Sequence, residues 1–271
     1  MAEASGIRLR SSFKLAFRQT GGRDWLGFTR QDLKNYLWTK RQQDLKLGEA
    51  GSLLEYFADK SKKDSSFHFN IQLDVEEQIT NIFWVDPKMI IDYSVIGDFV
   101  SFDTTSRTCK DYRLLAVFWG FNNYRKGVIF GVALLYDETA TSFEWFFRSF
   151  LDTMSGKKQK TFFTNQDSAM AKAISLVTLD TFHRICTWHM KRNAIKHLGS
   201  KYVGDHGGIG VELGKFIYNY EDEESFCIAW EDMLDRFDVH DNSWLSTIYG
   251  VMEKWAKPFV MTVWSTWVDT T

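Results

Sequence analysis

The chain has 271 residues, and with 44% hydrophobic and 25% charged residues its composition is that of a globular protein with an ample core. The formal net charge of −2 indicates that the chain as a whole is not a generic binder of polyanions. No run of 18 apolar residues predicts a membrane span, and the polar segment Met1–Lys14 lacks the apolar core of a signal peptide. Three widely spaced cysteines argue for a reducing compartment, so we expect a soluble intracellular protein.

Charge and aromatic content are both distinctive. Residues 201–271 carry 5 Lys/Arg and 13 Asp/Glu, a net of −8, so residues 1–200 carry a net of +6. Any phosphate-facing surface is therefore expected in the first 200 residues. Aromatic residues reach 16%, which predicts a core rich in Phe and Trp, with a stacking surface for nucleic acid as the alternative.

The N-terminal part of the chain divides into a polar lead-in over residues 1–23 and a helical and strand extension over residues 24–80. Thr29 is a predicted helix N-cap, with Asp32 as the acid three residues later. An apolar stripe follows at helical spacing, and a second helix is predicted over Gly51–Asp59. The two helices together predict an N-terminal helical hairpin.

Residues 81–200 are predicted to form an α/β core. In the preceding extension, apolar and polar residues alternate and predict a further strand that joins this core. Polar linkers and hairpin-forming residues separate these elements. The predicted strands are Phe67–Leu73, Ile79–Val85, Asp98–Thr104, Tyr112–Phe121, Gly127–Tyr136, Lys160–Thr164 and Thr181–Cys186. The predicted helices are Thr141–Met154, Ser168–Val177 and Met190–Leu198.

Strands joined by short links, followed by alternating helices and strands, give the element order of a ribonuclease-H-like fold, a mixed sheet flanked by helices. Residues 201–271 predict an acidic, helical insertion. One helix follows the acidic cap Glu221–Glu224, and another is expected over Ser243–Trp255. The apolar run Val263–Trp267 predicts that this insertion is incomplete and the domain truncated.

A series of short motifs carries a resemblance to a known family. The motifs are Phe83-Trp84-Val85-Asp86, Asp98–Thr105, Gly131–Thr139, Met154-Ser155-Gly156-Lys157, Thr164-Asn165-Gln166-Asp167 and Cys186-Thr187-Trp188-His189. In this order they resemble the Mutator-like element (MULE) transposase domain of the plant far-red-impaired-response and far-red-elongated-hypocotyl proteins. The likeness runs from about Gly27 to Pro258.

The resemblance implies a domesticated transposase that is located in the nucleus and acts in transcriptional regulation. Its implied partners are DNA, other transcription regulators and, as a homodimer or heterodimer, related family proteins. Members of the family also carry an N-terminal zinc-dependent DNA-binding domain and a C-terminal zinc finger of the SWIM type. Three scattered cysteines cannot build either zinc domain within this chain.

The transposase pattern also implies a catalytic site of three acids that hold divalent metal ions. Asp103 matches the first acid, but Asn165 stands where the second acid is expected. An amide lacks the charge that Mg²⁺ or Mn²⁺ prefers, so at most a weak divalent site at Asp103 is predicted, with Asp167 as a substitute ligand. The third acid lies outside the chain, and Glu253 is expected to be an ordinary exposed helix residue.

Cys186 and His189 match the family's Cys-x-x-His motif. Two ligands do not make a closed zinc site, and His183 is the one neighbour that could add a third. We expect the motif to stabilise the turn from strand to helix, with a metal contact as the alternative. The pair Asp137-Glu138 is interpreted as a helix start.

Seven basic residues in the stretch from Lys157 to Lys201 are candidates for a DNA-facing side. The alternative is that they form an ordinary solvated surface. These residues are Lys157, Lys158, Lys160, Lys191, Arg192, Lys196 and Lys201.

The sequence therefore predicts a non-catalytic, transposase-derived domain that contacts DNA or proteins in a transcription regulator. Two alternatives stay open. The first is a metal-dependent transposase or nuclease that uses Asp103, Asp167 and an acid outside the chain. The second is a truncated relic without function.

Overall fold

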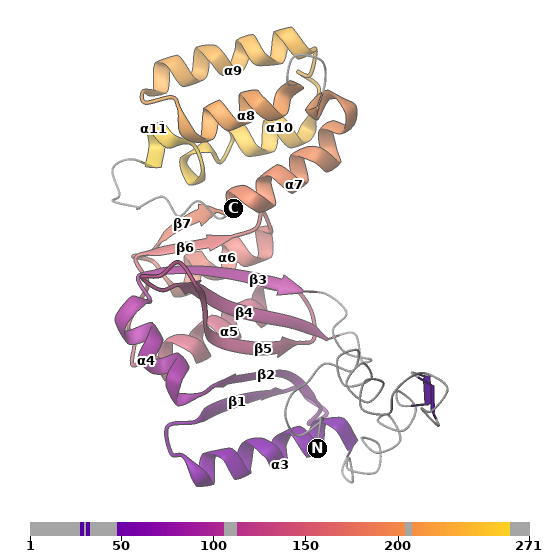
Figure 1. Cartoon of the computed structure of the whole chain (residues 1–271), viewed down its shortest axis with the longest axis vertical. Coiled ribbons are helices and arrows are strands. Elements are labelled where there is room, and N and C mark those ends of the chain that lie inside the picture. The colour runs from indigo at the N-terminus through magenta and orange to yellow at the C-terminus, as the bar shows by residue number, and fades with distance from the viewer. Residues whose placement is uncertain (1–27, 30, 33–47, 106–112, 204–207, 261–271) are drawn as a thin grey trace, which may run out of the picture. The chain divides into compact units, whose positions relative to one another are not determined.

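The computed structural model describes residues 28–29, 31–32, 48–105, 113–203 and 208–260 (Figure 1). The chain divides between Asp64 and Ser65 into two compact units. In the first unit, the backbone N–H and the hydroxyl of Thr29 donate to Asp32, each at 2.7 Å, and the N–H of Asp32 donates to the Thr29 hydroxyl. This reciprocal pattern confirms the predicted helix start. The apolar stripe that follows it lies outside the described residues.

The second predicted helix of this unit is longer than expected. Helix α3 covers Gly48–Lys63, whereas the sequence predicted Gly51–Asp59. Lys60, Lys62 and Lys63 lie in its last turn, where positive charges favour the helix dipole. The helix therefore begins three residues earlier and ends four residues later than predicted.

The second unit is built on one mixed sheet of seven strands in the order β1-β2-β5-β4-β3-β6-β7. Neighbouring strands pair antiparallel from β1 to β3, whereas β3, β6 and β7 pair in parallel. All predicted strands are present, with ends shifted by one or two residues at most. Their bounds are β1 (His68–Leu73), β2 (Ile79–Val85), β3 (Phe99–Thr105), β4 (Leu114–Phe121), β5 (Gly127–Leu135), β6 (Thr161–Thr164) and β7 (Phe182–Ile185).

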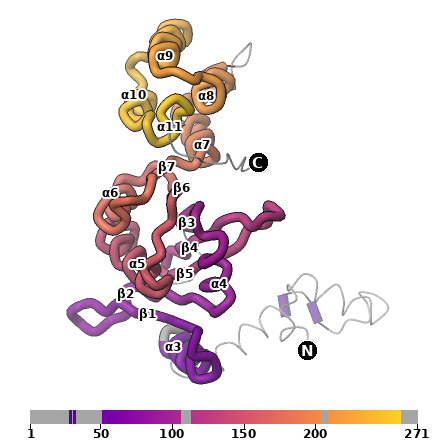
Figure 2. The backbone as a smooth tube through the Cα atoms, turned by 90° about the vertical axis from the view of Figure 1, so that its left-hand side faces the viewer, coloured from indigo at the N-terminus to yellow at the C-terminus, as the bar shows by residue number. Residues whose placement is uncertain are grey.

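Helices α5 (Ala140–Thr153) and α6 (Ser168–Val177) pack together on one side of the strands (Figure 2). Helix α4 (Pro87–Ile96) was missed by the sequence analysis. The signal was present, because Asp86 caps the helix by accepting the N–H of Met89 at 2.9 Å, and Pro87 fills the first helical turn.

Phenylalanine rings fill the space between the sheet and α5. The ring of Phe118 on β4 lies 4.1 Å from that of Phe150 and 4.6 Å from that of Phe146, measured between centroids. Phe102 on β3 packs against the same helix in edge-on contacts with Phe143 and Phe147. The high aromatic content is thus mainly a core, as the sequence predicted.

A second core lies among the helices that follow β7. Trp230, Trp244 and Trp255 are buried in it. The predicted helix Ser243–Trp255 is wrong in its length, because the helix ends at Tyr249 before Gly250 and a separate 3₁₀ turn spans Met252–Lys254. Helix α8 was not predicted. The helices of this cluster are α7 (Thr187–Leu198), α8 (Gly208–Tyr218), α9 (Glu223–Phe237), α10 (Ser243–Tyr249) and α11 (Lys257–Val260).

None of the described helices is both long and apolar enough to cross a membrane.

Replacing Phe118 by Ala should lower the free energy of unfolding by about 3–5 kcal/mol, because a fully packed ring leaves a cavity among its neighbours. Urea unfolding followed by circular dichroism measures this change. Tyr124→Ala is the matched control, since Tyr124 is 84% exposed at the turn between β4 and β5 and should change stability by less than about 0.5 kcal/mol. Equal losses in the two variants would contradict the packing described for β4 and α5.

Candidate functional site

Three polar residues lie level with one another at the ends of the parallel strands. Phe163 on β6 pairs with Ser101 on β3, and Thr164 pairs with Ile185 on β7. Continuing this parallel register by one or two residues sets Asp103, Asn165 and Cys186 side by side. Adjacent strands are about 4.8 Å apart, so the three side chains share one edge of the sheet. The sequence placed each of them at a strand end, and the sheet order makes them neighbours.

His189 closes this arrangement from helix α7. The helix starts directly after Cys186, and His189 lies in its first turn. The ring Nε2 of His189 is 3.4 Å from Oδ1 of Asp103. The Asp103 carboxylate of the candidate site thus has an imidazole as its ionic partner.

Asp103, His189 and Cys186 influence one another's protonation. The hydrogen bond to Asp103, followed by the contact with Cys186, raises the pKa of His189 to about 9. Burial would raise the pKa of the Cys186 thiol, but the ring and the backbone N–H of His189 lower that pKa overall. The ring Nδ1 of His189 is buried and has no hydrogen-bond partner of good geometry among the described residues. The nearby Cys186 thiol therefore raises the pKa of His189 through its proximity and charge. At neutral pH the ring is a cation between two acidic groups.

The loop after β6 uses Asn165 and Asp167 for its own structure. The Asn165 side-chain oxygen accepts the N–H of Asp167 at 2.9 Å. Asp167 is the N-cap of α6, and its Oδ1 accepts the N–H of Met170 at 2.8 Å. Both positions stabilise the entry into α6, which is a local role that either side chain performs without a metal.

The residues at this edge do not fit a pair of divalent ions. Among the described residues, no three His, Cys, Asp or Glu side chains are grouped so that they could hold a metal. Asp103 contributes one carboxylate, and that carboxylate faces a protonated imidazole. Mg²⁺ and Mn²⁺ require several oxygen ligands, preferably charged, and among the described residues that lie level at this edge Asp103 is the one carboxylate.

Other candidate ligands lie elsewhere. His183 contacts the Thr164 hydroxyl at 2.7 Å, and burial, followed by the charge of Lys254, lowers its pKa to about 4. Residues three apart on an extended strand face opposite sides, so His183 does not join Cys186. Glu253 is exposed in the 3₁₀ turn after α10. Neither residue completes a site with Asp103.

The Asp137-Glu138 pair serves the start of α5, as the sequence predicted. Asp137 accepts hydrogen bonds from the hydroxyls of Thr139, the helix N-cap, and Ser142. Glu138 has a second contact that the sequence did not reveal, because its carboxylate accepts the hydroxyl hydrogen of Thr104 at 2.8 Å. Thr104 follows Asp103 on β3, so Glu138 ties the α5 entry to that strand.

Gln166 is a site residue that sequence reasoning missed. Its side-chain oxygen accepts the amide N–H of Asn193 on α7 at 2.6 Å and the indole N–H of Trp244 on α10 at 3.4 Å. The residue joins the loop after β6 to two helices of the second core. Its position between Asn165 and Asp167 was the available signal, but its partners are far away in sequence.

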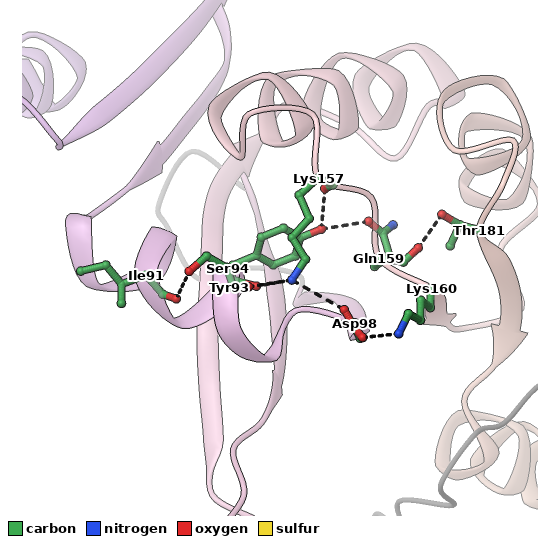
Figure 3. A network of polar contacts seen from close by, with 8 residues as sticks. All are labelled: Ile91, Tyr93, Ser94, Asp98, Lys157, Gln159, Lys160 and Thr181. Carbon is green, nitrogen blue, oxygen red and sulfur yellow. Dashed lines mark hydrogen bonds and ion pairs between the residues drawn. The ribbon is translucent and has the colours of Figure 1, made fainter.

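Three of the predicted DNA-facing lysines are already paired, at the end of the sheet opposite Asp103. Lys157 donates to the backbone oxygen of Ser94 at 2.9 Å, and Lys160 pairs with Asp98 at 2.7 Å (Figure 3). Lys158 pairs with Asp180 at 2.8 Å. These side chains tie the start of β6 to neighbouring elements.

Three more of the predicted cations lie on α7. Arg192 stacks on Trp188, with its guanidinium carbon 4.8 Å from the ring centroid, and Lys191 lies 5.3 Å from that of Tyr218. Lys196 is exposed. Lys201, just after this helix, donates to the backbone oxygens of Phe237 and Asp238. The predicted basic set is therefore divided between two ends of the fold.

Residues 99–193 match the MULE transposase domain, the stretch that runs from β3 into α7 and contains the whole arrangement around Asp103. The core is thus transposase-derived.

Among curated proteins, the chain is similar to plant proteins of the FAR1-related group. The chain is 31% identical to the protein FAR1-RELATED SEQUENCE 5 of Arabidopsis thaliana over 95% of its own length and 32% of that protein. It is 31% identical to FAR1-RELATED SEQUENCE 7 of the same plant, over 89% of its own length and 31% of that protein. It is 30% identical to FAR-RED IMPAIRED RESPONSE 1, also of that plant, over 91% of its own length and 30% of that protein. The chain carries a MULE transposase domain of the FAR1-related kind, which confirms the predicted resemblance. It spans about a third of the length of these relatives.

Replacing Asp103 by Asn should lower the pKa of His189 from about 9 toward its ordinary value of 6.5, because the largest cause of the shift is removed. In the native protein the raised pKa means that the protonated ring stabilises the fold below about pH 6.5, and that this stabilisation fades as the pH rises toward 9. NMR titration of the imidazole measures the pKa directly.

Asp235→Asn is the matched control, since it removes a carboxylate from an exposed pair with His240 and should leave His189 unchanged. A native His189 that titrates near 6.5 would contradict the Asp103 contact.

Proposed function

We propose that this chain is a non-catalytic, ribonuclease-H-like transposase domain that acts as a binding module in nuclear transcriptional regulation. The observation that carries the proposal is the state of Asp103, whose carboxylate faces His189 and, within the described residues, is not grouped with further acids. The regulatory and nuclear parts of the proposal rest on the resemblance to the FAR1-related proteins.

Strand topology supports the ribonuclease-H-like assignment. Three antiparallel strands, β3, β4 and β5, are followed by the parallel strands β6 and β7 on the far side of β3. This gives the order β5-β4-β3-β6-β7, with the first acid of the pattern on the central strand β3. The remaining strands β1 and β2 extend the sheet beyond β5.

Electrostatics supports the absence of catalysis. Strand transfer or hydrolysis of DNA requires two divalent ions held by clustered carboxylates. Here a protonated His189 already balances the charge of Asp103, and the neighbouring position is the uncharged Asn165. A metal ion would have to displace a cation, and among the described residues level with Asp103 it would find no second carboxylate. The energy of metal binding is therefore small in this chain.

The competing enzyme hypothesis needs Asp167 as a ligand. The Oδ1 of Asp167 caps α6 by accepting the N–H of Met170. Rotation of this carboxylate toward a metal ion would leave that N–H without its hydrogen bond. The relic hypothesis predicts an unfolded protein. The two packed cores of the second unit argue for a folded one.

The test is Mn²⁺ binding to the full chain by calorimetry, with three variants. The native chain should bind no Mn²⁺ in the micromolar range. Asn165→Asp together with His189→Gln should gain binding, because the double variant adds a carboxylate and removes the competing cation. Asp103→Ala added to that double variant should abolish the gain.

The alternatives give different results. Micromolar Mn²⁺ binding by the native chain, lost in Asp103→Ala, would overturn the non-catalytic proposal and call for DNA cleavage assays. A chain without a cooperative urea transition would favour the relic hypothesis.

A further inference from the structure

Helix α7 has one packed face and one face open to solvent. Met190, Ala194 and Leu198 are buried at spacings of four residues. The opposite face consists of Trp188, Arg192, Ile195 and Lys196, all exposed, and we call it the α7 strip. The strip starts beside His189 and runs about 12 Å along the helix.

Trp188 does not serve the core. Its side chain is 46% exposed, whereas Trp230, Trp244 and Trp255 are 1%, 7% and 2% exposed. Arg192 stacks on its ring, and the ring of His189 meets it edge-on at 4.8 Å between centroids. The indole is therefore held in place while much of its surface faces solvent.

The positive charge of α7 is not neutralised by acids on the same helix. The helix contains Lys191, Arg192 and Lys196 but no Asp or Glu. Within the part of the chain that the structure describes, none of the three has an ion pair with a carboxylate, unlike the lysines at the start of β6. On the neighbouring α8, Glu212 already contacts Lys215 and Arg236. Asp103 faces His189.

We propose that the α7 strip binds single-stranded nucleic acid. Arg192 and Lys196 contact consecutive phosphates, with Lys191 beside them, and an unpaired base stacks on Trp188. Exposed aromatic rings next to unpaired cations are the pattern by which proteins hold single strands without reading sequence. In a duplex the base faces are stacked on one another, so the indole would contribute nothing there. This inference rests on the proposed role as a binding module and names its partner.

The experiment is fluorescence anisotropy of a labelled single-stranded oligonucleotide, and of its duplex, titrated with the full chain at several salt concentrations. The native chain should bind the single strand more tightly than the duplex. The logarithm of the association constant should fall with the logarithm of salt with a slope of about −2, as expected for three phosphate contacts.

Variants separate the two contributions. Trp188→Ala should weaken single-strand binding about tenfold without changing the salt slope, and Trp188→Phe should restore most of it. The double variant Arg192→Gln/Lys196→Gln should reduce the slope by about 1.4. Lys158→Gln/Lys160→Gln is the matched control, because it removes the same charge at the opposite end of the sheet and should change neither quantity. Circular dichroism verifies that each variant is folded.

Two results would overturn the inference: folded native protein that binds neither oligonucleotide, or binding that prefers the duplex and is unaffected by Trp188→Ala. Either result leaves the non-catalytic proposal standing, because that proposal is tested by Mn²⁺ binding.

Discussion

Parallel hydrogen bonding between β3, β6 and β7 sets Asp103, Asn165 and Cys186 level at one edge of the sheet, and the candidate site depends on that register. Because α7 follows β7 directly, its first turn carries His189 across the edge to Asp103. A shift of one residue in either pairing would turn the polar side chains to different faces. The phenylalanine core between the sheet and α5 holds β3 and β4 in place, so the site inherits its geometry from apolar packing.

The ion pair between Asp103 and His189 gives this edge a chemistry unlike that of a metal centre. A carboxylate can be balanced by a protein cation or by a metal ion, and the raised pKa of His189 favours the protein cation at neutral pH. An amide at Asn165 removes the repulsion between neighbouring carboxylates that a metal would otherwise relieve. The charge of the Asp103 carboxylate is therefore balanced by a cation of the protein itself.

Cations are divided between structural and available roles. At the start of β6, Asp98 and Asp180 form ion pairs with the lysines, and these pairs connect neighbouring elements. On α7, none of the three cations has an ion pair with a carboxylate of the described residues, although the chain as a whole is slightly acidic. Glu212, the acid on the neighbouring α8, contacts Lys215 and Arg236. The cations of α7 are therefore open to an anionic partner, and they lie next to the polar edge.

The sequence by itself determined the alternation of strands and helices, the polar residues at the strand ends and the transposase resemblance, because periodicity and short motifs are local properties of the chain. It missed α4, α8 and α11, and it joined α10 to the following turn, where caps and glycines decide between short helices. Only the tertiary structure could pair His189 with Asp103, connect Gln166 to Asn193 and Trp244, and separate the two groups of cations. Those contacts join residues far apart in the chain, and their distances follow from strand order and helix packing, which no local pattern encodes.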